Sequence, residues 1–393
     1  MPPPSDASRR RLLRHLALGA AAISPTWPGA APGPKDMIRL GQSVPLSGPA
    51  QHLGIEYQRG LQLAFNAANA DGGIGGRQIE LISYDDGYEP EIALGNTRDL
   101  LDADGVFALV GYVGAESVNR CLPIAVNAGV PFVAPLTGAE SLRRNPSRWL
   151  FHVRPGLQAE TRLIAQAMQT FDIARVAVLV QDDADGVAGL EALSDALVSL
   201  KAAKPVAVAC VGRNSTGQVE LKSRDTAAAA LTLAAAQPQA LVCLAAYAST
   251  AAVLKSMRDG GFAGPCYATS LSSAAAIAPL LGARTAGLYV TQVVPSPYDL
   301  SRPTVTAFLK QLRASGTAAP EYVSLEGWIV GSTVVEALRR MPRGAGRDAF
   351  VSALESLSGS DLGGFALRWD AQRRQVSGQV SLTVLDAAGR PRR

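Results

Sequence analysis

The side chains that most often carry out catalysis are few in this chain and lie far apart in the sequence. The 393 residues contain only three His, namely His15, His52 and His152. A Ser-His-Asp triad or a metal site built from several His is therefore improbable. Asp85 and Asp86 are adjacent acids at the end of an expected strand, where ordering a turn is a commoner role than acid–base catalysis. The sequence predicts no catalytic residue, no metal site and no cofactor.

The glycine cluster at 72–76 and the four cysteines do not indicate chemistry either. The cluster follows an expected helix and precedes an expected strand, whereas a dinucleotide fingerprint follows a strand and opens a helix. It therefore predicts a turn that needs positive φ angles. Cys121, Cys210, Cys243 and Cys266 lack the spacing of a zinc site and lie in apolar surroundings, which is typical of buried thiols. Cys243 and Cys266 fall on consecutive expected strands and form the candidate disulfide pair.

The charge distribution separates a basic leader from a nearly neutral body. Residues 1–31 contain Arg9, Arg10, Arg11 and Arg14 but a single acid, so they account for three units of the formal net charge of +4. A basic start, a short apolar stretch and small residues describe an export signal, and the adjacent arginines resemble a twin-arginine signal. The apolar stretch is shorter than the ~20 residues of a membrane-spanning helix. We expect a soluble protein exported to the periplasm. Its neutral body lacks the cationic face that nucleic acid requires.

Beyond residue 36, short apolar runs alternate with amphipathic segments, and the series restarts after a Pro- and Arg-rich stretch at 145–155. This alternation is typical of parallel strands covered by helices on both faces. It predicts an α/β fold with two Rossmann-like lobes. The expected elements include helices at 54–70, 157–170 and 189–201, a strand at 240–247, and two paired strands at 365–370 and 376–385.

The chain is expected to cross between the lobes several times, which makes a hinge. Lobe one is assigned residues 37–154 and 295–358. Lobe two and the hinge are assigned residues 155–294 and 359–393.

The loops beyond the carboxyl ends of the expected strands are the candidate binding surface, because open α/β sheets bind ligands there. In lobe one and lobe two these loops are rich in Gly, Ser, Thr and Asp. Their free backbone N–H groups and hydroxyls suit a ligand carboxylate. Two such rims facing each other form a cleft with hydrogen-bond donors but without a nucleophile and base, which predicts a binding protein and not an enzyme.

Several motifs of the first half belong together: residues 44–49 (Val-Pro-Leu-Ser-Gly-Pro), 69–77 (Asn-Ala-Asp-Gly-Gly-Ile-Gly-Gly-Arg), 84–86 (Tyr-Asp-Asp) and 130–135 (Val-Pro-Phe-Val-Ala-Pro). They resemble type I periplasmic binding proteins of the leucine/isoleucine/valine-binding kind, and the similarity runs from about residue 37 to residue 385. The resemblance implies two lobes joined by three crossings and closure of the lobes around a small ligand. It also implies delivery of that ligand to the permease of an ABC importer. We expect the protein to be a monomer.

The resemblance further implies which residues line the site. In lobe one, the carboxylate grip falls on Ala115 and on Leu136, Thr137 and Gly138, with Ser117 near it and Leu53 on the wall. In lobe two, the family's Tyr-Gly after the first strand falls on Gly186 and Val187, with Asp185 beside them. Tyr247 matches a tyrosine of the family's site, and Ser270 is the last candidate. The acid that would pair with the ammonium group of an amino acid falls near Ser270, where this sequence has no carboxylate, and Asp185 is the candidate substitute. An amino acid, a small carboxylate and an aromatic acid remain alternative ligands.

Two other functions stay open at this point. A ligand sensor of the same fold would signal to a partner protein, and a neighbouring kinase or regulator gene would favour it over import. An α/β enzyme would turn over the molecule that it binds.

Overall fold

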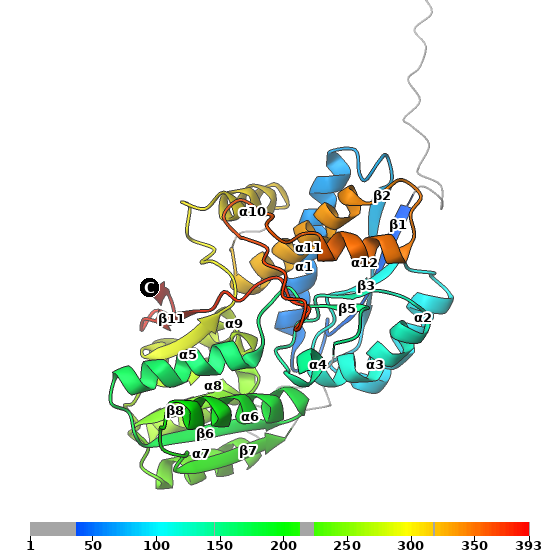
Figure 1. The fold of residues 1–393 in the computed structure, drawn as a ribbon. Coiled ribbons are helices and arrows are strands. Elements are labelled where there is room, and N and C mark those ends of the chain that lie inside the picture. Colours follow the sequence, from blue (N-terminus) through cyan, green and yellow to red (C-terminus); the bar gives the residue numbers. More distant parts are fainter. Residues whose placement is uncertain (1–36, 145, 213–223, 317–318, 393) are drawn as a thin grey trace, which may run out of the picture.

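The computed structural model describes residues 37–144, 146–212, 224–316 and 319–392. They form two α/β lobes, each built on its own sheet (Figure 1), which confirms the predicted fold class. The export signal predicted for residues 1–31 lies outside the described residues. Within the described part of the chain, every helix is too short or too polar to cross a bilayer.

The sheet of lobe one is parallel, with strand order β2-β1-β3-β4-β5. Its strands are β1 (Met37–Val44), β2 (Gln78–Asp85), β3 (Ala108–Val110), β4 (Phe132–Val133) and β5 (Leu150–Phe151). The helices between them are α1 (Gln51–Ala70), α2 (Pro90–Asp102), α3 (Ala115–Asn127) and α4 (Ser141–Arg144). Successive strand residues face opposite sides of a sheet, so Leu40 and Val110 pack towards α1 while Leu109 and Phe132 pack towards α2 and α3. Helices therefore cover both faces of this sheet.

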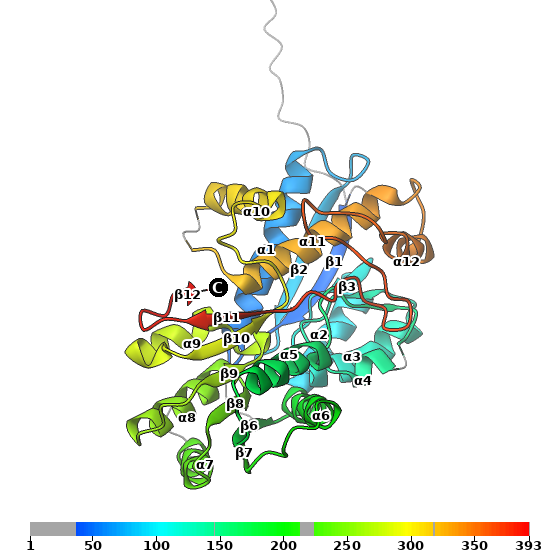
Figure 2. The same ribbon diagram turned by 60° about the vertical axis from the view of Figure 1, so that its left-hand side comes forward.

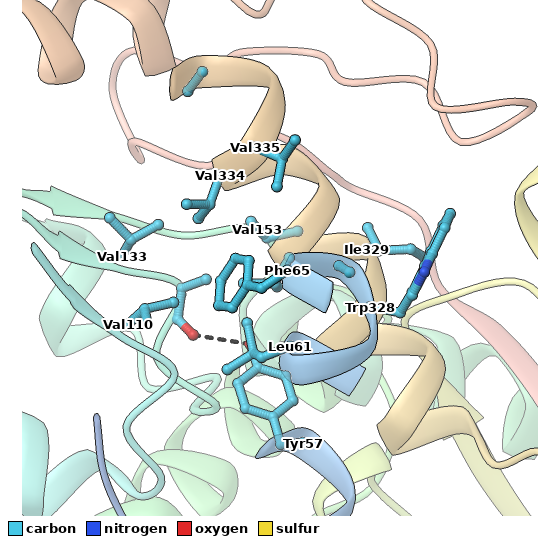
Figure 3. Packing of buried hydrophobic residues seen from close by; sticks show 14 of the residues in the cluster. Tyr57, Leu61, Phe65, Val110, Val133, Val153, Trp328, Ile329, Val334 and Val335 are labelled. Carbon is cyan, nitrogen blue, oxygen red and sulfur yellow. Dashed lines mark hydrogen bonds between the residues drawn. The ribbon is translucent and has the colours of Figure 1, made fainter. Parts of the chain in front are cut away.

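The core of lobe one is centred on the contact between α1 and α11 (Tyr322–Arg340). Tyr57, Leu61 and Phe65 recur every four residues, so they share one face of α1, and Figure 3 shows them between the strands and α11. The Tyr57 hydroxyl donates to the Ala134 carbonyl oxygen at 2.9 Å, which satisfies the polar end of a buried ring. Helix α1 is thereby fixed to the loop after β4.

The sheet of lobe two has the order β12-β11-β10-β9-β8-β6-β7, parallel from β7 to β10 and antiparallel beyond. Its strands are β6 (Val176–Asp182), β7 (Ala207–Gly212), β8 (Ala240–Leu244), β9 (Cys266–Ala268), β10 (Leu288–Gln292), β11 (Ser381–Leu385) and β12 (Pro391–Arg392). Its helices are α5 (Leu157–Thr170), α6 (Ala184–Ser199), α7 (Arg224–Ala235), α8 (Tyr247–Asp259) and α9 (Ala274–Leu281), with 3₁₀ turns at Ser270–Ser272 and Gly282–Thr285. Helices α5 and α6 cover one face, and α7, α8 and α9 cover the other.

The chain passes between the lobes after β5, again after β10 and again before β11. Between the last two passages it forms α10 (Pro303–Ala314), α11 and α12 (Arg347–Glu355), whose apolar residues join the core of lobe one. The predicted hinge of several crossings is confirmed, whereas the residue boundaries assigned to the two lobes stay a prediction.

The strand pair predicted at 365–370 and 376–385 is confirmed only in part. The segments meet at one antiparallel bridge, Asp370 opposite Gln375, and the Arg368 N–H donates to the Val376 carbonyl oxygen at 2.7 Å. Strand β11 instead pairs antiparallel with β10, with Leu385 opposite Leu288, and Figure 2 shows it along the edge of the lobe-two sheet. Phe365 packs into the core of lobe one. The apolar alternation identified the strand β11 correctly, but not its partner. A strand can pair with any open sheet edge, and β10 pairs with β11 along five residues.

Two turns agree with their predicted roles. Gly72, Gly73, Gly75 and Gly76 have φ angles of 94°, 72°, 59° and 87°, which confirms the turn with positive φ. The Asp85 carboxylate accepts hydrogen bonds from the backbone N–H groups of Leu46 at 2.8 Å and Ser47 at 3.1 Å. This acid therefore orders the loop after β1, as the capping interpretation predicted.

Candidate functional site

A cavity of about 50 Å³ lies between the two lobes and has room for a few water molecules. Its lobe-one wall includes Ala50, Leu53, Tyr88, Val113, Gly114 and Leu136. Its lobe-two wall includes Gln181, Asp183, Asp185, Leu244, Thr269 and Leu271. These residues lie at or just beyond the carboxyl ends of strands, at the edges where the sequence predicted binding loops. The predicted site residues Leu53, Leu136 and Asp185 are among them.

The carboxylate grip predicted in lobe one faces this cavity and already holds a carboxylate. Gly114, with a φ of 90°, turns the chain so that α3 begins at Ala115. The first N–H groups of a helix have no partner within the helix, and the Ala115 N–H donates to Asp185 Oδ2 at 2.7 Å. The Thr137 hydroxyl donates to Asp185 Oδ1 at 2.6 Å. The structure therefore brings together three predicted site residues, Ala115, Thr137 and Asp185, from opposite sides of the cleft.

The Asp185 carboxyl is in an unfavourable setting for a charge. Burial, and next the negative charge of Asp183, raise its pKa to about 6. The hydrogen bonds from Thr137 and Ala115 and the positive charge of Arg154 act in the opposite direction. The whole residue keeps part of its surface exposed, but its carboxyl group is enclosed by both lobes. At neutral pH the grip therefore holds a carboxylate that is partly stripped of water.

Helix α6 positions Asp185, and it begins earlier than predicted. The sequence predicted a helix over 189–201, but α6 begins at Ala184 because the Asp183 side chain caps it, accepting from the Gly186 N–H at 2.8 Å. Asp183 also accepts from Gln181 Nε2 at 2.5 Å and, across the cleft, from the Tyr88 hydroxyl at 3.3 Å. Asp185 thus stands in the first turn of a capped helix and not in a loop.

Tyr247 stands at the start of α8, where the strand predicted over 240–247 has already ended at Leu244. The residue is buried, and its ring lies edge-on to the ring of His52 in lobe one, with centroids 6.1 Å apart. Burial raises the pKa of the Tyr247 phenol, and a hydrogen bond with the backbone of His52 opposes that shift. Tyr247 is therefore a second point of contact between the lobes.

Ser270 belongs to a buried charged cluster beside the hinge. Its hydroxyl accepts from the Arg154 guanidinium, and its N–H donates to Glu160 Oε2 at 2.8 Å. Arg154 lies 3.6 Å from Glu160 Oε1 and 3.4 Å from Glu326 Oε1, and these three side chains are at most 5 % exposed. Burial raises the pKa of Glu326 to about 6, although Arg154 opposes the shift. Contact of Ser270 with a ligand stays a prediction, because its polar atoms are engaged in this cluster.

The remaining predicted residues, Ser117 and Gly138, lie behind the grip. Ser117 is buried in α3, and its hydroxyl has no hydrogen-bond partner among the described residues. A Cβ at Gly138 would lie 2.6 Å from Leu157 Cγ, so glycine lets the Thr137 loop pack closely on the start of α5. Gly138 thereby supports the position of the grip.

Sequence reasoning missed Tyr88, Gln181 and Asp183 as individual members of the site. All three lie at or just beyond the carboxyl ends of β2 and β6, so the rule for open α/β sheets was a sufficient signal for the region. The rule could not identify the individual residues, because the contact between Tyr88 and Asp183 depends on how the two lobes are oriented relative to each other.

Other reactive side chains lie away from the cleft. The Sγ atoms of Cys243 and Cys266 are 3.6 Å apart on neighbouring strands, and both residues are free thiols. Within the described residues, His, Cys, Asp and Glu side chains form no group of three or more that could hold a metal ion.

Comparisons with known proteins agree with this architecture. A family model for periplasmic binding proteins matches residues 37–390. The Leu/Ile/Val-binding protein homolog 7 of Brucella abortus (strain 2308) is 29% identical over 157 residues, which are 40% of this chain and 38% of that protein. The match therefore spans well under half of the length of this curated relative.

Two solved structures resemble the chain over nearly its whole length. A possible leucine/isoleucine/valine-binding protein from Rhodopirellula baltica SH 1 superposes with a TM-score of 0.84 and 28% identity, covering 91% of this chain and 96% of that one. A substrate-binding periplasmic protein from Ralstonia solanacearum superposes with a TM-score of 0.82 and 26% identity, covering 89% of this chain and 98% of that one.

Proposed function

The chain belongs to the periplasmic binding protein family, and from this premise we propose that it is an extracytoplasmic solute-binding protein. It binds a small amino-acid-like or carboxylate ligand between its lobes. The closed form then delivers the ligand to the permease of an ABC importer. The leader at residues 1–31 directs the chain to the periplasm, where it acts as a monomer.

The observation that carries this proposal is the direction of the lobe-one donors. The Ala115 N–H and the Thr137 hydroxyl point across the cleft and engage the two oxygens of one carboxylate, that of Asp185. A ligand carboxylate presents the same pair of oxygens at the same spacing. Hydrogen bonds from neutral donors to a carboxylate are among the stronger ones in proteins. The grip is therefore suited to the charged end of a small acid.

The lining of the cavity suits the other end of such a ligand. Leu53 and Leu136 of lobe one and Leu244 and Leu271 of lobe two face the space, and they would cover an aliphatic or aromatic tail. Asp185, next to the grip, is the acid available to an ammonium group when the ligand is an amino acid. Few polar groups among apolar walls are typical of small-molecule sites.

Closure around the ligand is stabilised by the contacts that the ligand makes with both lobes at once, which exist only in the closed form. Moving a two-state equilibrium from 1:99 to 99:1 takes ~5.5 kcal/mol of differential binding. A ligand bound with micromolar affinity releases ~8 kcal/mol in total, so one small molecule is sufficient to close the hinge. The importer then distinguishes the closed shape from the open one.

A thermal-unfolding screen with amino acids, aliphatic acids and aromatic acids tests the proposal. A ligand at 100 times its Kd adds ~2.7 kcal/mol to the free energy of unfolding, which raises the melting temperature measurably. Stabilisation by members of one class identifies the ligand. Failure of all three classes to stabilise the protein would refute the proposed ligand class.

Thr137→Val then tests the grip with the ligand that the screen finds. The change keeps the shape of the side chain and removes the donor, so affinity measured by titration calorimetry should fall about tenfold or more. Thr170→Val is the matched control, because Thr170 lies at the exposed end of α5 and bonds only within its own helix in the described contacts. Both variants are made in the Asp185→Ala protein, so that no side chain competes for the Thr137 hydroxyl. Equal affinities for the two variants would then show that the grip does not hold the ligand.

A further inference from the structure

The lobe-one grip is occupied by a side chain of the protein itself. Asp185 reaches from the first turn of α6 and places its two carboxylate oxygens 2.7 Å from the Ala115 nitrogen and 2.6 Å from the Thr137 hydroxyl. A ligand carboxylate held by the same two donors needs the same positions. Asp185 and such a ligand therefore exclude each other.

The lobes are also joined by contacts that use no ligand. The Tyr88 hydroxyl donates to Asp183 at 3.3 Å, and the rings of His52 and Tyr247 meet edge to face. The cavity that remains is about 50 Å³, which holds a few water molecules but not the side chain of an amino acid such as leucine. The arrangement is a closed cleft held by the chain's own residues.

We propose that Asp185 is a tethered carboxylate that competes with the ligand for the lobe-one grip and, when bound there, holds the two lobes together. This inference rests on the proposed function only in taking the grip to be the ligand's carboxylate site. Its consequence is that a ligand with a carboxylate must release Asp185 before it binds. The stability of the Asp185 contact therefore subtracts from the affinity of every such ligand.

Charged or polar groups face Asp185 from the cap of its own helix and from three other segments of the chain. Asp183, which caps α6, repels its carboxylate, and Arg154 beside the hinge attracts it. The Ala115 N–H and the Thr137 hydroxyl supply the direct bonds from lobe one. Burial and the negative charge of Asp183 thus weaken the contact of the Asp185 carboxylate with lobe one. A contact weakened in this way can be broken by a ligand.

Hydrogen exchange of the ligand-free protein tests the proposal directly. In the wild type the Ala115 amide is protected by Asp185, so Asp185→Ala should accelerate its exchange about tenfold and increase the radius of gyration measured by X-ray scattering. Asp182→Ala is the matched control, because Asp182 is an exposed acid three residues earlier with the same charge. Wild-type exchange at Ala115 in Asp185→Ala would overturn the proposal.

Acetate provides a second test, because it carries the same carboxylate as the Asp185 side chain but is not attached to the chain. Acetate should restore the protection of the Ala115 amide in Asp185→Ala, whereas sodium chloride at the same concentration, which supplies an anion without a carboxyl group, should not. Lack of rescue by acetate, or equal rescue by sodium chloride, would contradict a grip for a carboxyl group. Should Asp185→Ala fail to fold, Asp185→Val removes both acceptor oxygens while keeping a side chain of similar size, and it is measured in the same way.

The two proposals fail in different ways. If the ligand screen is negative while Asp185→Ala opens the protein and acetate closes it again, the tether stands and the proposed ligand class falls. If a carboxylate ligand binds the wild type while Asp185→Ala leaves the Ala115 amide unchanged, the solute-binding function stands and the tether falls.

Discussion

The close approach of α1 and α11 makes Gly60 a sensitive position in the core of lobe one. An added Cβ at Gly60 would lie 2.1 Å from the Ser324 carbonyl oxygen and 2.5 Å from the Trp328 nitrogen, both backbone atoms of α11. Real Cβ atoms essentially never come within 3.0 Å of such neighbours. Backbone atoms cannot rotate away as a side chain does, so Gly60→Ala must push the two helices apart by roughly 1 Å.

The expected cost follows from this displacement. Overpacking a core costs ~1–3 kcal/mol, and the upper end applies because the obstructing atoms are backbone. The better helix propensity of alanine stabilises the variant by ~1 kcal/mol. Subtracting this gain from a cost of ~3 kcal/mol leaves Gly60→Ala about 2 kcal/mol less stable than the wild type. Gly95→Ala in α2 is the matched control, because nothing lies within 4 Å of its added Cβ. The control should gain ~0.5–1 kcal/mol.

Urea unfolding followed by tryptophan fluorescence measures both variants. Trp149, Trp328 and Trp369 pack on the core of lobe one, so the signal reports the lobe that contains the substitution. The difference between the variants should be about 3 kcal/mol, with Gly60→Ala below the wild type and Gly95→Ala above it. A Gly60→Ala protein as stable as the wild type would refute the backbone contact between α1 and α11.

The hinge cluster, the cysteines and the tether each give a measurable outcome. Arg154→Met should lower the free energy of unfolding in urea by about 3–5 kcal/mol, because it leaves Glu326 buried without its cation; a loss below about 1 kcal/mol would contradict this. An alkylating reagent should modify Cys210 in the native protein and spare the other cysteines, which are buried; mass spectrometry of the peptides checks it. Lowering the pH from 7 to 5 should favour the closed ligand-free form about tenfold, measured by X-ray scattering. In the closed form, burial and the negative charge of Asp183 raise the pKa of Asp185 to about 6, although Arg154 opposes the shift. An exposed Asp has a pKa of ~3.9. Because the closed form binds the proton more tightly, protons stabilise it by linkage. Opening at low pH would reverse the sign and refute the assignment.

Local patterns in the sequence were sufficient for most elements. Helix α5 has the bounds that its amphipathic period predicted, Leu157–Thr170, and the turn at 72–76 has the positive φ angles that its glycines indicated. Continuous apolar runs identified strands buried on both faces. These features depend on side-chain period and backbone preference, which act over a few residues and are therefore visible without the fold.

The site was predictable as a place but not as a set of contacts. The strand-end rule located the cleft, and the family resemblance pointed to Ala115, Thr137 and Asp185 without indicating that they bond to one another. The Ala115 and Asp185 partners are 70 residues apart and belong to different lobes. Their contact depends on the angle of the hinge, for which a sequence has no local signal.

The errors have the same origin. Helix α6 begins earlier than predicted because the Asp183 side chain caps it, and that side chain also accepts from the Tyr88 hydroxyl across the cleft. Strand β11 pairs with β10 because the edge of β10 is open to it. Secondary-structure type is a property of short segments, so it could be inferred from residue order. Which strand or side chain an element contacts depends on surfaces that come together only when the chain folds. The tertiary structure therefore determines these partners.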